Sequence, residues 1–274
     1  MFKTLIFAAL AVNLAAGPAQ AQVGADLNIS PKRVVFDPGE RSATVYIFNQ
    51  GDQEATYTVE LVDRVMLPSG QIIAAADHPG ATVASAADLI QYTPRRVTLP
   101  PRQSQVVRVR ARAGGDGKPE HRTHLTVTAL PSETAGFTVE QAAGPASGEV
   151  SLRVVALFSV SIPMIVRDGP VDARAAIENA VIKAAGDGAA LSLDLVRKGA
   201  NSVYGDVEIR AGQGAKTRTL AAVRGVAVYP EIERRAVLVA LPADLPRGEP
   251  LTILYRDDDA RPGETLATAT IVAP

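Results

Sequence analysis

One run of the sequence, VSLRVVALFSVSIPMIV at positions 150–166, constrains the fold more than any other feature. Every even position in it is apolar, from Val150 through Phe158 to Val166, whereas serine, arginine and proline occur among the odd positions. Strict alternation predicts an extended strand with one fully apolar face. At roughly 3.3 Å per residue the strand would be about 55 Å long, whereas a usual strand has about five or six residues. One small domain cannot easily cover that whole face, so the question is what covers the rest.

The N-terminus has the pattern of a secretory signal peptide. Lys3 is followed by an apolar stretch from Leu5 to Ala16, and Ala19-Gln20-Ala21 is a small-x-small cleavage site. The apolar stretch is too short to span a bilayer. We therefore expect residues 1–21 to be removed and the mature protein to be secreted. The alternative, an N-terminal membrane anchor, is disfavoured because no charged stop follows.

Composition excludes several classes of function. The chain has 274 residues, no cysteine and a formal net charge of −1. Without cysteine there is no thiol chemistry and no disulfide, so an exported chain must be held by its apolar cores alone. The absence of a basic surplus argues against nucleic-acid binding. No other apolar run is long enough for a membrane helix, so no membrane insertion is expected.

Turn signals recur about every ten residues between short alternating segments, which indicates β-sandwich domains. The first unit is predicted over residues 22–167 and the second over 168–274, with the boundary at Asp168-Gly169-Pro170. A single helix is predicted, from Arg174 to Ala180. The fold class is therefore predicted to be all-β with two domains.

The sequence offers no convincing catalytic or metal site. His121 and His124 lie three apart in a predicted strand, so their side chains point to opposite faces. The acidic run Asp257 to Asp259 lacks the alternating ligand spacing of calcium loops and is interpreted as a solvated turn. Nucleophile and phosphate-binding motifs are missing. We predict that the protein is not an enzyme and needs no cofactor and no metal.

Several segments of the first unit, taken together, resemble the periplasmic pilus chaperones, the PapD-like family. Their order and spacing across about 140 residues make the resemblance specific, although each motif alone is weak. The matching segments are Ile29–Phe36, Ala43–Asn49, Tyr92–Pro101 with the Gln-x-x-Arg strand that starts at Ser104, His121–Pro131, and the ending Ile162–Arg167. The Ile-Pro-x-x-x-Arg form of that ending is similar to the archaic class of these chaperones.

The resemblance implies two immunoglobulin-like β-sandwiches in an L-shaped arrangement. It implies a chaperone that lends its last first-domain strand to a pilus or fimbrial subunit and delivers the subunit to an outer-membrane usher, without ATP. This is donor-strand complementation, a form of strand addition. By register with the ending at Arg167, the donated side chains would be Leu152, Val154, Ala156 and Phe158. Ile162, Met164 and Val166 would close the chaperone's own core.

The family also grips the subunit's terminal carboxylate with a basic pair in the cleft between the domains. Arg33 matches the first position, but Pro163 occupies the second, where the well-known members have lysine. Arg122 is the predicted substitute. Arg167 matches the interdomain salt-bridge position. Its candidate partners are Asp257 to Asp259, of which Asp258 is the predicted one. Thr123 stands where the family has a further acid, so this bridge is predicted to be a pair.

Two other functions are compatible with a secreted β-sandwich protein. The first is a structural or adhesive component of a surface organelle, although residues 22–26 are too short for a donor extension. The second is a carbohydrate-binding or hydrolytic domain, disfavoured by the aromatic share of 4%. An exposed apolar strand is an aggregation hazard. We therefore expect a self-capping dimer, or a folded-back loop from residues 136–148, when no subunit is bound.

Overall fold

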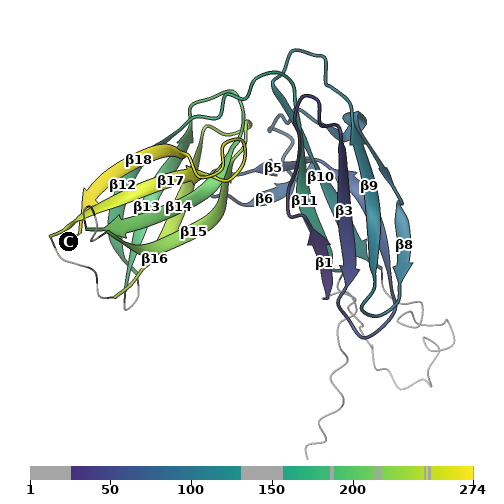
Figure 1. Cartoon of the computed structure of the whole chain (residues 1–274), viewed down its shortest axis with the longest axis horizontal. Helices are drawn as coiled ribbons and strands as arrows, with labels where there is room; N and C mark the ends of the chain where they lie inside the picture. The colour runs from purple at the N-terminus through teal and green to yellow at the C-terminus, as the bar shows by residue number, and fades with distance from the viewer. Residues whose placement is uncertain are drawn as a thin grey trace, which may run out of the picture.

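A computed structural model describes residues 26–130, 157–185, 188–212, 214, 217–243, 245 and 248–273. Within these residues the chain is built from β-strands and two short 3-10 turns, η1 (Ala75–Asp77) and η2 (Ala87–Leu89). Figure 1 shows two elongated lobes that meet at an angle. The predicted all-β fold with two β-sandwich domains is confirmed. No helix in the described part of the chain is long and apolar enough to cross a membrane.

The first domain is a sandwich of two sheets with an additional hairpin. One sheet has the order β1 (Leu27–Ser30), β3 (Ser42–Asn49), β9 (Ser104–Ala111) and β7 (Ile90–Thr93). The other has the order β2 (Val34–Phe36), β11 (Ser159–Arg167), β10 (Glu120–Ala129), β4 (Ala55–Val62) and β8 (Arg96–Leu99). The hairpin consists of β5 (Arg64–Met66) and β6 (Ile72–Ala74).

The first extended segment of the chain serves both sheets. β1 pairs antiparallel with β3, and after a break at Pro31 β2 pairs parallel with β11. Leu27 and Ile29 from β1 and Phe36 from β2 all enter the same buried core. Because one segment belongs to both layers, it closes the sandwich at the side where β11 lies.

Strand β11 contains the described part of the long alternating run. Its even positions Ile162, Met164 and Val166 are buried in the core of the first domain, as predicted. On the opposite face, Ser159 and Ser161 lie opposite Thr128 and Thr126 of β10, and each pair of hydroxyls shares a hydrogen bond of 2.8 Å. Residues 150–156, which include Leu152, Val154 and Ala156, lie outside the described residues.

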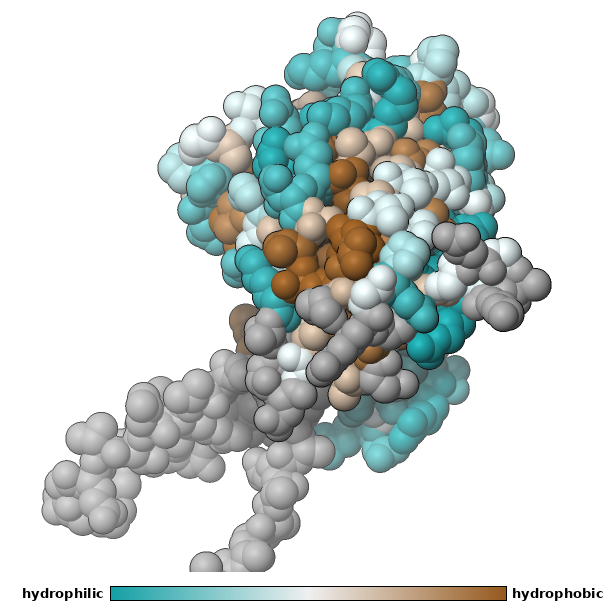
Figure 2. Space-filling view, turned by 90° about the vertical axis from the view of Figure 1, so that its left-hand side faces the viewer, coloured by the Kyte–Doolittle hydropathy of each residue, from teal (hydrophilic) through white to brown (hydrophobic). Residues whose placement is uncertain are grey.

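The second domain is a sandwich of two further sheets around its own core. One sheet has the order β12 (Ala175–Ala185), β13 (Gly188–Arg197) and β16 (Arg234–Leu241). The other has the order β15 (Arg218–Val228), β14 (Val203–Ala211), β17 (Pro250–Asp257) and β18 (Thr265–Val272). Figure 2 shows apolar residues gathered between hydrophilic ones on the end of the molecule that this domain forms.

The predicted helix from Arg174 to Ala180 is wrong, because this segment belongs to strand β12. β12 pairs with β13, and the register shifts between Glu178 and Val181. Asn179 has a φ of 51°, so the chain bulges there. A bulge inserts one extra residue and interrupts the alternation of the strand, which removed the sequence signal for it.

Met164 provides a test of how far β11 supports the first domain. Its side chain is fully buried, so Met164→Ala should leave a cavity and lower the free energy of unfolding by about 2–5 kcal/mol. Leu157, just before the same strand, is 62% exposed, and Leu157→Ala should change stability by less than about 0.5 kcal/mol. Urea unfolding followed by circular dichroism measures both. Equal losses would contradict the assigned faces of the strand.

Candidate functional site

Arg167, the last residue of β11, is the central charge of the joint between the domains. Its side chain is 1% exposed. Its Nη2 atom donates to Oδ2 of Asp259 in the second domain at 2.6 Å, and its Nε atom donates to Oε2 of Glu120 in the first at 3.4 Å. Its Nη1 atom also lies 3.5 Å from Oδ1 of Asp37 in the first domain. Three carboxylates from the two domains thus compensate one buried guanidinium, which could not remain charged in the interior without them.

The predicted partner of Arg167 is corrected by one position, because Asp259 and not Asp258 contacts it. The turn after β17 decides this. The carboxylate of Asp257 accepts hydrogen bonds from the backbone N–H groups of Asp259 and Arg261, at 3.2 and 2.6 Å. This local turn leaves Asp258 exposed.

Glu120 and Asp37 join Asp259 in the bridge, so the prediction of a simple pair is also wrong. Glu120 lies directly opposite Arg167 in the antiparallel register of β10 and β11. Its Oε2 atom also accepts hydrogen bonds from the backbone and hydroxyl groups of Ser202 in the second domain, at 3.2 and 3.0 Å. The family position at Thr123 lacks an acid, and Glu120 supplies the charge from three residues earlier on the same strand.

Arg33 lies in the same joint, just before β2. Its Nη2 atom donates to Oδ2 of Asp259 at 2.8 Å, and its guanidinium lies 4.7 Å from the centre of the Tyr204 ring. Burial acts to raise the pKa of Asp259, but the nearby charges of Arg33 and Arg167 outweigh it and hold that pKa below its usual value of 3.8. The Nε and Nη1 atoms of Arg33 have no hydrogen-bond partner among the described residues.

The structure places Arg122 inside the joint rather than on an open wall of the cleft. The residue is 2% exposed, and its guanidinium lies 3.6 Å from the centre of the Tyr229 ring. Its Nη2 atom donates to Glu231 of the second domain and, at 2.9 Å, to the backbone oxygen of Arg64. One side of Arg122 thus helps to hold the two domains together.

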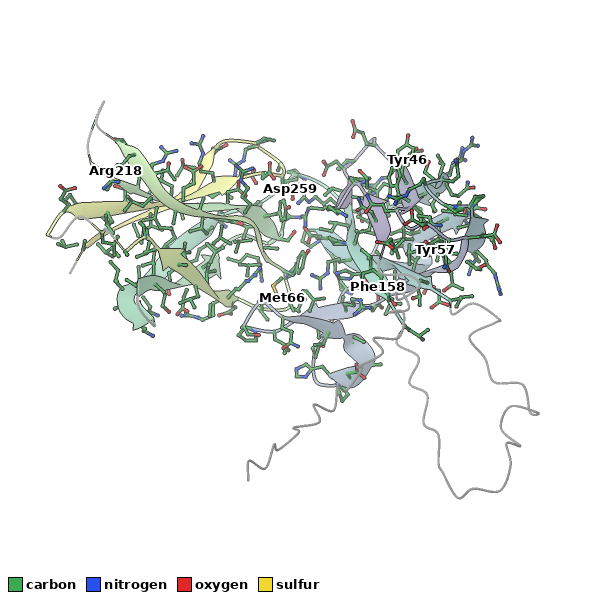
Figure 3. All side chains as sticks on the ribbon, turned by 90° about the horizontal axis from the view of Figure 1, so that it is seen from below. Tyr46, Tyr57, Met66, Phe158, Arg218 and Asp259 are labelled. Carbon is green, nitrogen blue, oxygen red and sulfur yellow. The ribbon has the colours of Figure 1, made fainter. Side chains whose placement is uncertain are left out.

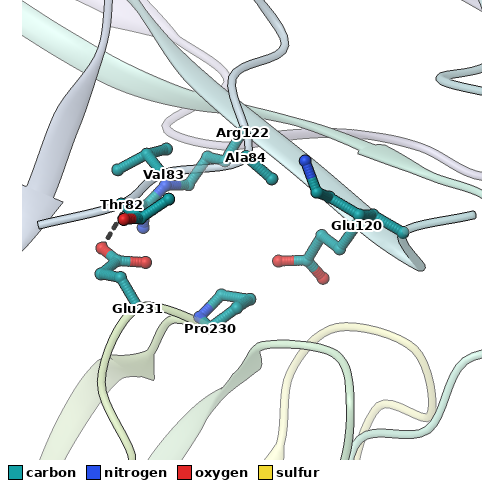
Figure 4. A pocket seen from close by; sticks show the side chains of 8 residues that line it. Thr82, Val83, Ala84, Glu120, Arg122, Pro230 and Glu231 are labelled. Carbon is teal, nitrogen blue, oxygen red and sulfur yellow. Dashed lines mark hydrogen bonds and ion pairs between the residues drawn. The ribbon is translucent and has the colours of Figure 1, made fainter. Parts of the chain in front are cut away.

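A small pocket of about 190 Å³ adjoins Arg122 between the domains. In Figure 4 the carboxylate of Glu120 faces the loop that contains Glu231, which is joined to Arg122. The pocket is lined by Thr82, Val83, Ala84, Lys118, Glu120, Arg122, Pro230 and Glu231. One oxygen of Glu120 and two nitrogens of Arg122 are buried there without a partner in the described part of the chain, so the lining retains capacity for polar contacts.

The hairpin β5–β6 fastens the joint from the first domain. The backbone N–H of Met66 donates to Glu231 at 2.8 Å, and the backbone oxygen of Pro68 accepts from Ala236 at 2.7 Å. Met66 also packs with Ile165, Ala227 and Tyr229 in a small apolar cluster between the lobes. Figure 3 shows Asp259 and Met66 on either side of this junction. Polar and apolar contacts therefore fix the angle between the domains together.

One edge of β11 is only partly paired in the described residues. β10 pairs along its whole length on one side, whereas β2 pairs on the other side only at Met164 to Val166. The backbone N–H of Ala129 donates to Phe158, so in an antiparallel ladder the backbone groups of Ser159 and Ser161 point to the other edge. Within the described ranges, no strand pairs with that stretch of edge.

Phe158 is the one predicted donor residue that the structure describes. It is half-buried against the first domain's core, whereas the neighbouring Leu157 is largely exposed. Phe158 therefore follows the same alternation as Ile162 and Met164, at the limit of the domain's own core. Leu152, Val154 and Ala156 stay predictions, because they lie outside the described residues.

The two histidines of β10 lie in different surroundings. Among the described residues, no group of three or more histidine, cysteine, aspartate or glutamate side chains is placed to hold a metal ion. His121 pairs through Nε2 with Asp116 at 3.0 Å. His124 has a buried Nδ1 atom without a partner in the described ranges.

Sequence reasoning missed Glu120, Glu231, Arg64 and His124 as members of this joint. Glu120 could have been found from the predicted pairing of β10 with β11, because it stands opposite Arg167. Glu231 lies 109 residues from Arg122 along the chain, so no local pattern points to the contact. Contacts between residues far apart in the sequence could be identified only from the folded structure.

Comparisons with known proteins give structural matches alone. No family model matches the chain, and no curated protein matches it either. Solved structures that resemble it include the CsuC–CsuE chaperone–tip adhesion subunit complex of Acinetobacter baumannii, at 12% identity over 90% of this chain and 99% of that one, with a TM-score of 0.46. The E. coli chaperone DraB matches at 16% identity over 90% and 96%, with a TM-score of 0.44. The Pseudomonas aeruginosa chaperone CupB2 matches at 13% identity over 90% and 100%, with a TM-score of 0.45. At these identities and TM-scores, nothing about the residues of the site is taken from these proteins.

The buried charges of the joint predict that substitution of Asp259 costs far more stability than substitution of its neighbour Asp258. Asp259→Ala leaves Arg167 buried with one of its main partners removed, and we expect a loss of about 3–5 kcal/mol of stability. Asp258→Ala, the matched control, should change stability by less than about 0.5 kcal/mol because the side chain is exposed. Urea unfolding measures both, and equal effects of the two substitutions would contradict the assignment.

The lowered pKa of Asp259 also predicts a pH dependence. A carboxylate with a lowered folded-state pKa contributes its full stability above the unfolded value and loses it as pH falls through the folded value. The urea midpoint of the unchanged protein should therefore exceed that of Asp259→Asn by a constant amount from about pH 8 to pH 5. The difference should shrink only below pH 3.8. A difference that already shrinks between about pH 7 and pH 5 would count against the ion pairs.

Proposed function

We propose that the protein is a periplasmic chaperone that binds pilus or fimbrial subunits by donor-strand complementation and delivers them to an outer-membrane usher. Binding is stoichiometric and uses no nucleotide, cofactor or metal ion. The observation that carries the proposal is that the apolar alternation of the sequence continues back to Val150, beyond Phe158, which is itself only partly buried against the first domain's core.

The end of β10 marks how far the described core of the first domain extends along the run. β10 ends at Ala129, and its last hydrogen bond to the described part of the run goes to Phe158. Ile162, Met164 and Val166 are buried in the core, whereas Phe158 and Val160 are only partly buried against it. The sequence continues the apolar alternation for four more even positions before Phe158, back to Val150. We infer that a partner buries this apolar continuation.

The partly unpaired edge of β11 supports strand addition as the mode of binding. Backbone groups of Ser159 and Ser161 face that edge, and a subunit strand would satisfy them. The apolar side chains of Leu152, Val154, Ala156 and Phe158 would fill the subunit's groove. Each well-buried side chain contributes roughly 1.5–3 kcal/mol before ordering costs are subtracted. Without a subunit, a second copy of the chain would cap the same edge.

Arg33 would anchor the terminal carboxylate of the subunit. Its Nη2 atom is held by Asp259, which fixes the guanidinium, while Nε and Nη1 keep unused donors. A fixed guanidinium with free donors favours a charge-assisted contact to a carboxylate. Arg122 would support this contact indirectly, because Glu231 and the ring of Tyr229 cover its guanidinium.

Strand donation is tested by charging the donor face. The chain is co-expressed with the secreted proteins encoded beside its gene, and the co-purified subunit is quantified. Val154→Asp and Phe158→Asp should each reduce its yield at least about tenfold, because each would bury a carboxylate in an apolar groove. Leu157→Asp is the matched control, since this side chain lies on the opposite face, and it should retain the yield. Folded variants that still hold the subunit would show that donation along this register is wrong.

The anchor is tested separately with Arg33→Ala in the same co-purification. We expect a loss of subunit yield of about tenfold or more, since a charge-assisted hydrogen bond is worth roughly 1.5–3 kcal/mol. Circular dichroism confirms that the variant is folded, and Arg102→Ala, at an exposed surface pair with Asp52, serves as a control. An unchanged yield would remove Arg33 from the site.

A further inference from the structure

His124 lies beside Pro163, the position at which the proposed carboxylate anchor lacks its second basic residue. It lies directly opposite Pro163 in the register of β10 and β11. On the other side of Pro163, the parallel pairing of Met164 with Val34 places Arg33 one residue before the paired stretch. Neighbouring strands are about 4.8 Å apart, so Pro163 lies between Arg33 and His124 at about one strand spacing from each.

The side chains of this row share the face that meets the second domain. Ile165, two residues after Pro163, packs with Tyr229 of that domain, and Arg122, two residues before His124, lies against the same ring. Residues two apart in a strand point to the same face. Pro163 is half-buried and has no hydrogen-bond donor, so it separates its two polar neighbours, Arg33 and His124, without bonding to either through an N–H group.

Arg33 and His124, the two neighbours of Pro163, both have polar atoms without described partners. His124 is 4% exposed, and its Nδ1 atom has no hydrogen-bond partner in the described part of the chain. The Nε and Nη1 atoms of Arg33 are also buried without described partners. Buried polar groups in native proteins nearly always have partners. The unused atoms on the two sides of Pro163 therefore indicate a polar ligand there.

We infer that His124 is the second group of the carboxylate anchor, in place of a basic residue at Pro163, and that it takes up a proton when the carboxylate binds. The inference rests on the proposed function, because it requires a subunit carboxylate beside Arg33. It implies that the site is regulated by pH, because its affinity for the subunit carboxylate would increase as the pH falls.

The charges around His124 explain why the proton arrives with the ligand. Burial first, and then the positive charges of Arg122 on β10, Arg64 on β5 and Arg33 before β2, lower the pKa of His124 to about 3. Glu60, which faces outward from the adjacent strand β4, is exposed to solvent. In the empty site the ring is therefore neutral at neutral pH.

The acids of the second domain in this joint contact arginines. Glu231 pairs with Arg122 and Asp259 pairs with Arg33, so each acid is engaged by an arginine. A ligand carboxylate over Pro163 would add a negative charge beside the ring of His124. An opposite charge at that range favours the protonated imidazole and raises its pKa. By linkage, a ligand that raises the pKa of His124 binds more tightly where the ring is protonated.

The test uses N-acetylglycine as the carboxylate probe and N-acetylglycinamide as the uncharged match. The three histidines of the chain are followed by NMR during pH titrations of the full protein, and His124→Gln identifies the signal. With N-acetylglycine the pKa of His124 should rise by at least one unit, whereas N-acetylglycinamide should leave it unchanged. If that pKa returns to 6.5, the probe should bind about tenfold more tightly at pH 5.5 than at pH 7.5.

Variants separate this inference from the anchor itself. His124→Gln and His124→Asn should abolish the tenfold pH dependence, while His78→Gln, in an exposed loop, should preserve it. Arg33→Gln should weaken binding at every pH. If the probe binds through Arg33 but the pKa of His124 does not move, the inference is overturned and the anchor stands. If N-acetylglycine does not bind at all, the carboxylate anchor fails, and the role of His124 fails with it.

Discussion

The buried charge of Arg167 is the interaction on which the two-domain structure depends. A guanidinium that is almost fully removed from water is costly unless it is paired and hydrogen-bonded. Glu120 supplies one partner from the first domain and Asp259 another from the second. Because Arg167 ends β11, the same residue fixes the position of that strand relative to the second domain. The strand that carries the proposed binding surface and the joint that supports it are therefore one physical unit.

The joint combines this charge network with a small apolar layer. Met66 from the β5–β6 hairpin packs with Ile165 and Tyr229, and the hairpin's backbone bonds to the second domain near Ala236. Separation of the domains would expose the apolar cluster and leave several charges without partners. We expect the angle between the lobes to be stiff, which keeps Arg33 and the open edge of β11 in a constant relation. A stiff relation is what a site needs if it is to hold one end of a partner while a strand pairs along its length.

Much of this arrangement could be predicted from the sequence, because it depends on local periodicity. The alternation of residues 150–166 placed Ile162, Met164 and Val166 in the core, and the structure confirms it. The motif resemblance pointed to Arg33 and Arg167 as residues of the joint. The choice between Asp258 and Asp259 depended on a turn held by Asp257, which periodicity does not describe. The contacts of Glu231 and of the hairpin join distant segments, and only the folded chain brings them together. The segment from Arg174 to Ala180 was mistaken for a helix because a bulge interrupts its strand pattern, and pairing with β13 decides its structure.

We propose that the outer edge of β11 and the run before it pair with a strand of another protein. Hydrogen–deuterium exchange measures this pairing most directly, by comparing the free chain with the chain bound to its co-purified subunit. Exchange should slow strongly in peptides that cover residues 150–161, because the backbone N–H groups there gain hydrogen-bond partners. Unchanged exchange in that segment, with protection appearing elsewhere on the chain, would contradict strand pairing at β11.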